Sequence, residues 1–257
     1  MKTLTKDCIE WVKEFFAKLN KTKAVVGISG GKDSSVVAAI LVQALGKENV
    51  IGVTMPNGKQ KDIKDSYEVI KHLGIQHREV NIKNAFEELA LLTGAVKSEV
   101  AITNLPARLR MTTLYAVAQT EDALVANTCN LSEDYAPGGY ATLFGDNAGS
   151  FAPIQDLTVT EIIEMGEDLG LPYHLIHKTP VDGLQPLTDE EKISVQTGIE
   201  NWTYARFDKL IRCKEHDFTE KEVEILKAGA LSGKFKRDIV QIPKFISGFK
   251  NYFEVKE

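Results

Sequence analysis

Residues 29–35, with the sequence SGGKDSS, constrain the fold of this chain more than any other segment. They stand between two apolar runs, AVVGI at 24–28 and VVAAIL at 36–41, which predict a buried strand and then a helix. The adjacent glycines Gly30 and Gly31 allow a left-handed turn and a close approach of the backbone to a ligand. Free N–H groups at a helix start favour anions, and the serine hydroxyls add donors. The segment therefore predicts a strand, a glycine turn and a helix whose start binds a polyphosphate.

This loop differs from the Walker A motif, which has four residues between its glycines and a Lys-Ser or Lys-Thr pair after the second. Here an acidic residue, Asp33, follows the glycines. A carboxylate beside bound phosphates is favourable when a cation lies between them, so Asp33 is a candidate Mg²⁺ ligand. The alternative is that the helix dipole alone favours an acidic residue at this position.

The first two-thirds of the chain alternates predicted strands and helices. Strands are predicted at 23–28, 49–54, 77–82 and 123–128, and helices at 33–46, 60–73, 84–93 and 105–119. This alternation predicts an α/β fold with a doubly wound, mostly parallel sheet. Ligands in such sheets bind at the carboxyl ends of the strands, where SGGKDSS, MPNGKQKD and NTCNLSED would meet. A long loop region is predicted from residue 129 to about 160, and a helix with Thr158 as its N-cap follows.

Composition excludes several classes of protein. The net charge of -5 argues against a general nucleic-acid surface. No stretch approaches the roughly 20 apolar residues of a membrane span. Cys8, Cys129 and Cys213 lie far apart, which argues against a disulfide framework or a cysteine metal site and fits a reducing cytoplasm.

Two later segments carry polar groups suited to a binding site. NTCNLSED places Thr128 and Glu133 just past a predicted strand, where Glu133 could supply a second carboxylate for a cation at Asp33. Taken alone, Glu133 would be a solvated loop acid. The run 104–110 places an amide and two arginines at a predicted helix start, and arginine suits bidentate recognition of phosphate or carboxylate. Either arginine alone could equally be a surface charge.

Together these segments resemble the ammonia-dependent NAD⁺ synthetase family of the ATP pyrophosphatase (PP-loop) superfamily. The similarity runs in order over about residues 1–245. It consists of SGGKDSS at 29–35, P-x-G-x-Q at 56–60, N-x-x-A-R at 104–108, NT-x-N-x-SE at 127–133, FGD at 144–146, K-x-P at 178–180 and KR at 236–237. The first loop is specific only to the superfamily, whereas the ordered set is much more specific.

The resemblance implies a Rossmann-like fold of the adenine nucleotide alpha hydrolase type in a single domain. This domain would comprise an N-terminal helix (1–20), a nucleotide-binding core (21–170) and a C-terminal segment (171–257) that closes on the substrate. It also implies a cytoplasmic homodimer. The implied ATP-binding residues are Gly27, Ile28, Ser29, Gly30, Gly31, Lys32, Asp33, Ser34, Gln60, Thr128 and Lys178. Asp33 and Glu133 would hold Mg²⁺ and act in catalysis, and deamido-NAD⁺ would contact Asn104, Arg108, Asp146, Phe235 and Lys236.

The activity implied is the ATP-dependent amidation of deamido-NAD⁺ by free ammonia, giving NAD⁺, AMP and pyrophosphate through an adenylated nicotinate. The chain departs from the family at Leu143 and Val159, where lysines are common, and at Val181, where Thr or Ser is common. Three alternatives stay open. They are a GMP-synthetase-like amidating enzyme, a tRNA-thiolating enzyme, which cysteine spacing and charge disfavour, and a non-catalytic adenine-nucleotide sensor, which the missing lysines favour.

Overall fold

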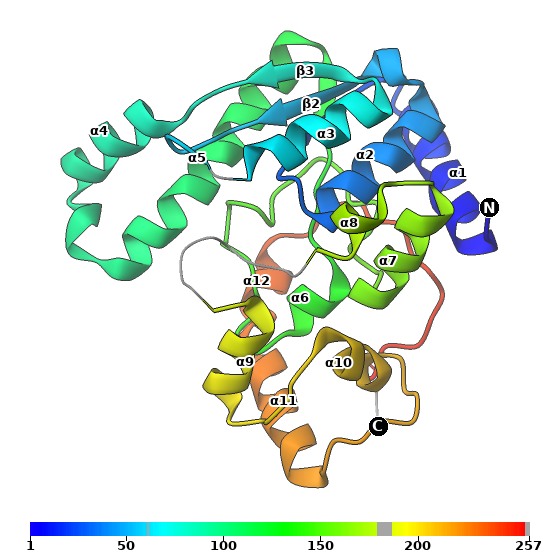
Figure 1. Cartoon of the computed structure of the whole chain (residues 1–257), viewed down its shortest axis with the longest axis vertical. Coiled ribbons are helices and arrows are strands. Elements are labelled where there is room, and N and C mark those ends of the chain that lie inside the picture. Colours follow the sequence, from blue (N-terminus) through cyan, green and yellow to red (C-terminus); the bar gives the residue numbers. More distant parts are fainter. Residues whose placement is uncertain (61, 179–186, 255–257) are drawn as a thin grey trace.

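The computed structural model describes residues 1–60, 62–178 and 187–254. A four-stranded parallel sheet lies in the upper half of Figure 1, formed by β1 (Lys23–Gly27), β2 (Val50–Thr54), β3 (Gln76–Glu79) and β4 (Ala123–Val125). The strand order is β3-β2-β1-β4. The chain advances from β1 to β3 and then returns to add β4 on the other side of β1. This reversal, with helices on both faces, confirms the predicted doubly wound fold.

Strand β1 is buried on both faces, and its side chains alternate between two apolar cores. Ala24 and Val26 pack with α1 (Thr3–Lys18), α2 (Lys32–Leu45) and α3 (Ile63–Leu73). Val25 faces the opposite way and packs with residues of α5 (Glu99–Thr120). Because helices cover both faces, β1 has a continuous apolar run instead of an alternating pattern.

Several predicted boundaries differ from the structure. The strand predicted over 77–82 ends at Glu79, and the helix predicted over 60–73 begins at Ile63. The helix predicted over 105–119 begins at Glu99, because the Ser98 side chain caps it by accepting a hydrogen bond from Ala101 N. Pro106, which the prediction placed near the helix start, lies inside α5. Strand β4 ends at Val125 instead of residue 128, and the predicted loop contains α6 (Leu131–Tyr135), which Asn130 caps.

Helices α6, α9 (Asp189–Thr197), α10 (Tyr204–Ile211) and α11 (Glu220–Ser232) build a separate apolar core below the sheet (Figure 1). Its largest buried side chains include Trp202, Phe207 and Leu226. The capping box of Thr158 and Glu161 confirms the predicted N-cap. The remaining helices are α4 (Lys83–Thr93), α7 (Val159–Asp168), α8 (Tyr173–Ile176) and α12 (Lys234–Ile239), with short 3-10 turns at Lys47–Asn49 and Ala95–Lys97. In the described ranges, no helix combines the length and apolar character needed to cross a membrane.

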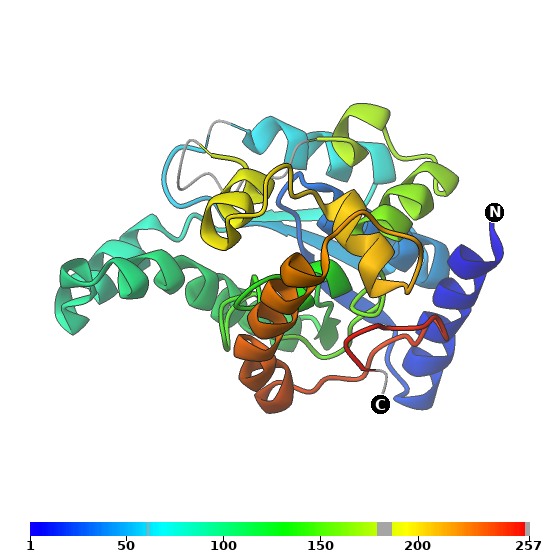
Figure 2. The same ribbon diagram turned by 90° about the horizontal axis from the view of Figure 1, so that it is seen from below.

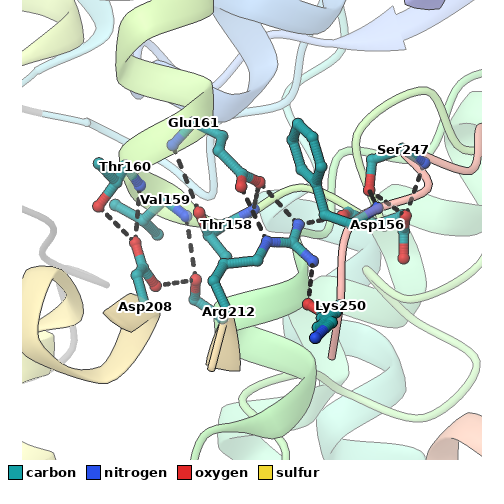
Figure 3. Close-up of polar contacts among 11 residues, drawn as sticks. Asp156, Thr158, Val159, Thr160, Glu161, Asp208, Arg212, Ser247 and Lys250 are labelled. Carbon is teal, nitrogen blue, oxygen red and sulfur yellow. Dashed lines mark hydrogen bonds and ion pairs between the residues drawn. The ribbon is translucent and has the colours of Figure 1, made fainter. Parts of the chain in front are cut away.

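A buried group of polar side chains fixes α10 against α6 and α7 (Figure 3). We call it the polar joint, and it consists of Asp208 of α10 and Arg212, the residue that follows α10, with their partners. The Asp208 carboxylate accepts from Ser132 Oγ at 2.5 Å and from Thr160 N at 2.8 Å. The Arg212 guanidinium donates to both Glu161 carboxylate oxygens, at 2.8 and 2.7 Å. The joint therefore fixes α10 relative to Ser132, the residue that precedes Glu133.

Candidate active site

The glycine loop connects β1 to α2 at the point where the strand order reverses. Gly30 has a φ of +80°, and a Cβ there would lie 2.9 Å from Asp65 Cβ and from Ser66 N of α3. Only glycine fits this position. Ser29 Oγ accepts from Gly31 N at 3.2 Å and lies 3.1 Å from Ser34 Oγ. The two serines thus brace the loop, and the backbone N–H groups at the start of α2 remain its anion-binding element.

Asp33 and Glu133 converge beside this loop, although 100 residues separate them in the sequence. Asn130 Nδ2 donates to Asp33 Oδ1 at 3.1 Å, and Asn130 Oδ1 accepts from Glu133 N at 3.0 Å. The Asn130 side chain therefore orients the Asp33 carboxylate and also caps the start of α6, the helix that carries Glu133. Burial, and next the charge of Asp33, raise the pKa of Glu133 well above its ordinary value.

Lys32 lies within this acidic group. Its side chain is buried, and its Nζ donates to Asp33 Oδ2 at 3.0 Å. Burial lowers the pKa of Lys32, but the carboxylates of Asp33 and Glu133 outweigh that effect and the pKa is raised overall. The ammonium group offsets part of the negative charge that the two acids concentrate here.

The two carboxylates fit a magnesium ion that is shared with a nucleotide. Mg²⁺ prefers oxygen ligands and is commonly bound by one or two carboxylates together with substrate phosphates. Within residues 1–60, 62–178 and 187–254, no group of three or more His, Cys, Asp or Glu side chains forms a self-sufficient metal cage. Asp33 and Glu133 would therefore supply two of the ligands, and the phosphates and water would supply the rest.

Gln60 and Lys178 meet at the side of the loop that packs on α3. Gln60 Nε2 donates to Asp62 Oδ1 at 2.9 Å, and Lys178 Nζ donates to Asp62 at 3.1 Å and to Asp65 at 2.8 Å. Asp65 is the residue that contacts Gly30. Thr128 follows β4 and is half-buried. Gln60 and Lys178 therefore share acidic partners at the start of α3, while Thr128 follows the strand on the other side of β1.

The substrate-side candidates gather around the loop that carries Asp146. Asp146 Oδ1 accepts from Thr142 N at 2.6 Å. Asn104 Oδ1 accepts from Thr142 Oγ1 at 2.6 Å, and the exposed Arg108 donates through Nε to Leu143 O at 3.2 Å. Both motif residues of α5 thus contact this loop.

The C-terminal helix α12 reaches the same loop. Lys236 Nζ donates to Gly139 O at 2.6 Å and to Ala141 O at 2.8 Å, whereas Phe235 is exposed to solvent. Desolvation by the surrounding protein raises the pKa of Asp146, and the positive charges of Lys236 and Arg110 oppose that rise. Two basic side chains thus lie close to this carboxylate.

Sequence reasoning did not single out several polar residues that the fold brings to the site. Arg110 donates through Nε to Met55 O, at the end of β2, at 3.1 Å, and its charge faces Asp146. The resemblance selected Arg108, the last residue of the N-x-x-A-R motif, whereas Arg110 lies two residues beyond it. From the C-terminal helices, Asp189 of α9 accepts from Tyr140 Oη at 2.7 Å, and Tyr204 of α10 lies beside Lys32. No local pattern marked these last residues, because only the tertiary fold places them there.

The structure describes two of the three positions at which the chain departs from the family pattern. Val159 is buried at the start of α7, where its N–H donates to Ser132 Oγ, and Leu143 is half-buried beside Arg108. Neither side chain carries charge into the site. Val181 lies outside the described residues.

Comparison with known proteins identifies the family. The NAD synthase family pattern matches residues 4–250, nearly the whole chain. The chain belongs to the NAD synthase family. An NH(3)-dependent NAD(+) synthetase of Pyrococcus furiosus is 35% identical over 183 residues, which cover 71% of this chain and 70% of that protein.

Solved structures extend the similarity. An NMN synthetase from Francisella tularensis superposes with a TM-score of 0.80 at 30% identity, over 94% of this chain and 98% of that one. An NH3-dependent NAD synthetase from Campylobacter jejuni superposes with a TM-score of 0.71 at 26% identity, over 94% and 99%. This NAD synthase family member therefore shares nearly its whole fold with an NMN synthetase and with an NH3-dependent NAD synthetase.

Proposed function

We propose that this chain amidates deamido-NAD⁺ with ammonia, consuming ATP and releasing AMP and pyrophosphate. The supporting observation is the arrangement of two groups at one edge of the sheet. Asp33 and Glu133 flank the glycine loop, and Asp146 lies with Arg110 and Lys236 nearby. Such a site suits a reaction that joins a polyphosphate to a second anionic substrate.

The proposed reaction has two steps. An oxygen of the nicotinate carboxylate attacks the α-phosphorus of ATP, the bond to the β-phosphate oxygen breaks, and pyrophosphate leaves. Ammonia then attacks the acyl carbon of the adenylate. The bond between this carbon and the AMP oxygen breaks, AMP leaves with the bonding electron pair, and the attached nitrogen loses a proton to give the amide. Neither step needs a protein nucleophile, so the protein acts by positioning and by electrostatic stabilisation.

The residues have distinct proposed roles. The N–H groups at the start of α2 and Lys32 would hold the phosphates, while Arg108 and Lys236 would hold the second substrate. When bound, Mg²⁺ would neutralise charge on the phosphates. Asn130 orients the Asp33 carboxylate and caps the start of α6, the helix that carries Glu133.

A pyrophosphate-release assay tests the function. Purified protein with ATP, Mg²⁺ and deamido-NAD⁺ should release pyrophosphate, and ammonium should be needed to form NAD⁺. Glutamine free of ammonia should not replace ammonium. Pyrophosphate release that does not depend on deamido-NAD⁺ would contradict the proposal.

We further propose a homodimer in the cytoplasm, with residues 171–257 closing on the substrate. Helix α4 and the first part of α5 project from the rest of the protein (Figure 2) and expose a row of apolar side chains. They are Leu91, Leu92, Val96 and Val100, each at least 59% exposed. An exposed apolar patch of this kind marks an interaction surface. Light scattering should give twice the mass of one chain, and Leu92→Asp should reduce it.

A second candidate is the amidation of a nicotinate mononucleotide. The solved structure with a TM-score of 0.80 is titled an NMN synthetase, and it aligns over 98% of its length. Competition between deamido-NAD⁺ and nicotinate mononucleotide at equal concentration decides between the two substrates. The amide formed in excess identifies the preferred one.

A further inference from the structure

Tyr204 carries a buried hydroxyl that has no hydrogen-bond partner among the described residues. The side chain begins α10 and is only 3% exposed. Leaving a buried donor unpaired is costly, and most such groups in native proteins have a partner. A hydroxyl of this kind therefore calls for a functional explanation.

The Tyr204 side chain lies beside the phosphate end of the candidate site, within reach of the charges of Glu133 and Asp33. Lys32 Nζ lies 5.9 Å from the centre of the Tyr204 ring. Burial, and then the charges of Glu133 and Asp189, raise the pKa of Tyr204 well above its ordinary value, so the group remains protonated near pH 7 and can donate. Asp189 itself is held by Tyr140 Oη at 2.7 Å and by Lys192 Nζ at 3.3 Å.

The ring is fixed before any ligand binds. Tyr204 N donates to Glu190 Oε1 at 2.8 Å, and Trp202 packs against the ring edge to face with centroids 5.1 Å apart. Asp208, one turn further along α10, and Arg212, just after the end of α10, belong to the polar joint (Figure 3). The hydroxyl is therefore a preorganised donor, and such donors lose little entropy when they bind.

We propose that Tyr204 contacts the nucleotide, donating its hydroxyl hydrogen to an oxygen of the β- or γ-phosphate held by the 29–35 loop. This inference rests on the proposed use of ATP, and it assigns a ligand contact to the C-terminal helices. A phosphate is the acceptor that an anion-binding helix start would bring beside Lys32. The buried hydroxyl then gains its missing partner in the bound state.

Tyr204→Phe tests the contact, with Tyr135→Phe as a matched control. Tyr135 is also buried, but its hydroxyl donates to Glu254 at 2.6 Å and so has a partner inside the protein. Calorimetric titrations use ATP with Mg²⁺, inorganic pyrophosphate, and AMP, and thermal unfolding is measured for each variant without ligand.

For Tyr204→Phe we expect ATP and pyrophosphate to bind about ten- to a hundredfold more weakly, because a hydrogen bond to a charged group is lost. AMP affinity and the melting temperature should not fall. Tyr135→Phe should show the reverse, with a lower melting temperature and unchanged ATP affinity. Conservative removal of one hydroxyl thus separates a ligand contact from a structural one.

Unchanged ATP affinity in Tyr204→Phe, or equal weakening of ATP and AMP, would overturn the inference. A lower melting temperature with unchanged binding would overturn it as well. The titrations need no second substrate, so a wild-type protein that binds ATP but forms no amide would refute the proposed function and leave this inference standing. A wild-type protein that binds no ATP would refute both.

Discussion

Arg212→Met should destabilise the protein severely, because it breaks the polar joint. The Arg212 side chain is 4% exposed and donates to Glu161, to Asp156 O at 2.6 Å and to Lys250 O at 3.2 Å. The substitution leaves the Glu161 carboxylate, itself 14% exposed, without its buried cation. Breaking one side of such a pair costs about 3–5 kcal/mol. At about 2–4 °C per kcal/mol for a domain of this size, the melting temperature should fall by about 6–20 °C.

Urea unfolding and calorimetry measure this effect. Lys2→Met is the control, since Lys2 pairs with Glu164 and both side chains are more than half exposed, so its loss should cost under about 1 kcal/mol. Adding Glu161→Gln to Arg212→Met should recover part of the loss, because no lone charge then remains buried. A cost below about 1 kcal/mol for Arg212→Met would refute the view that this pair anchors α10.

Three further predictions concern the site. Asp33→Asn and Glu133→Gln should each slow adenylation severely at limiting Mg²⁺ while circular dichroism stays native; wild-type turnover would remove that residue from the proposed metal site. Arg108→Ala should weaken deamido-NAD⁺ about ten- to a hundredfold in calorimetry but hardly affect ATP, and equal losses would contradict this role. Burial raises the pKa of Asp134 to about 6, so its folded carboxyl binds a proton more tightly than the unfolded one and stability falls as pH rises from about 4 to 6. Asp134→Asn should therefore stabilise the protein by about 2–3 kcal/mol at pH 7 and by almost nothing at pH 3.5, as urea midpoints at the two pH values would show.

The sheet and its loop were predictable because their signals are local. An apolar run, two glycines and a helix start fix the path of the chain from β1 into α2, and the strand ends then assemble Asp33 with Glu133. The start of α5 was predicted wrongly because a proline, which often begins a helix, here lies inside one. A capping serine upstream was the stronger signal.

The contribution of the C-terminal helices could not be predicted from pattern alone. Asp189 and Tyr204 lie more than 150 residues beyond the glycine loop, and only the packing of α9 and α10 brings them to Lys32. Aromatic residues at helical spacing usually indicate core, and Tyr204 does pack in one. Sequence spacing identifies Tyr204 as a core residue, but it does not show that the side chain lies beside Lys32 and Glu133.

The alternation of side chains along β1 limits where the chain can tolerate an insertion or a deletion. Ala24 and Val26 face one core and Val25 faces the other, so deleting a single residue here would exchange the two faces of the strand. The same deletion would start the glycine loop one residue early and rotate Gly30 away from its contact with α3. Insertions and deletions should therefore be tolerated in the exposed turn near Gly170 but rejected within 23–31.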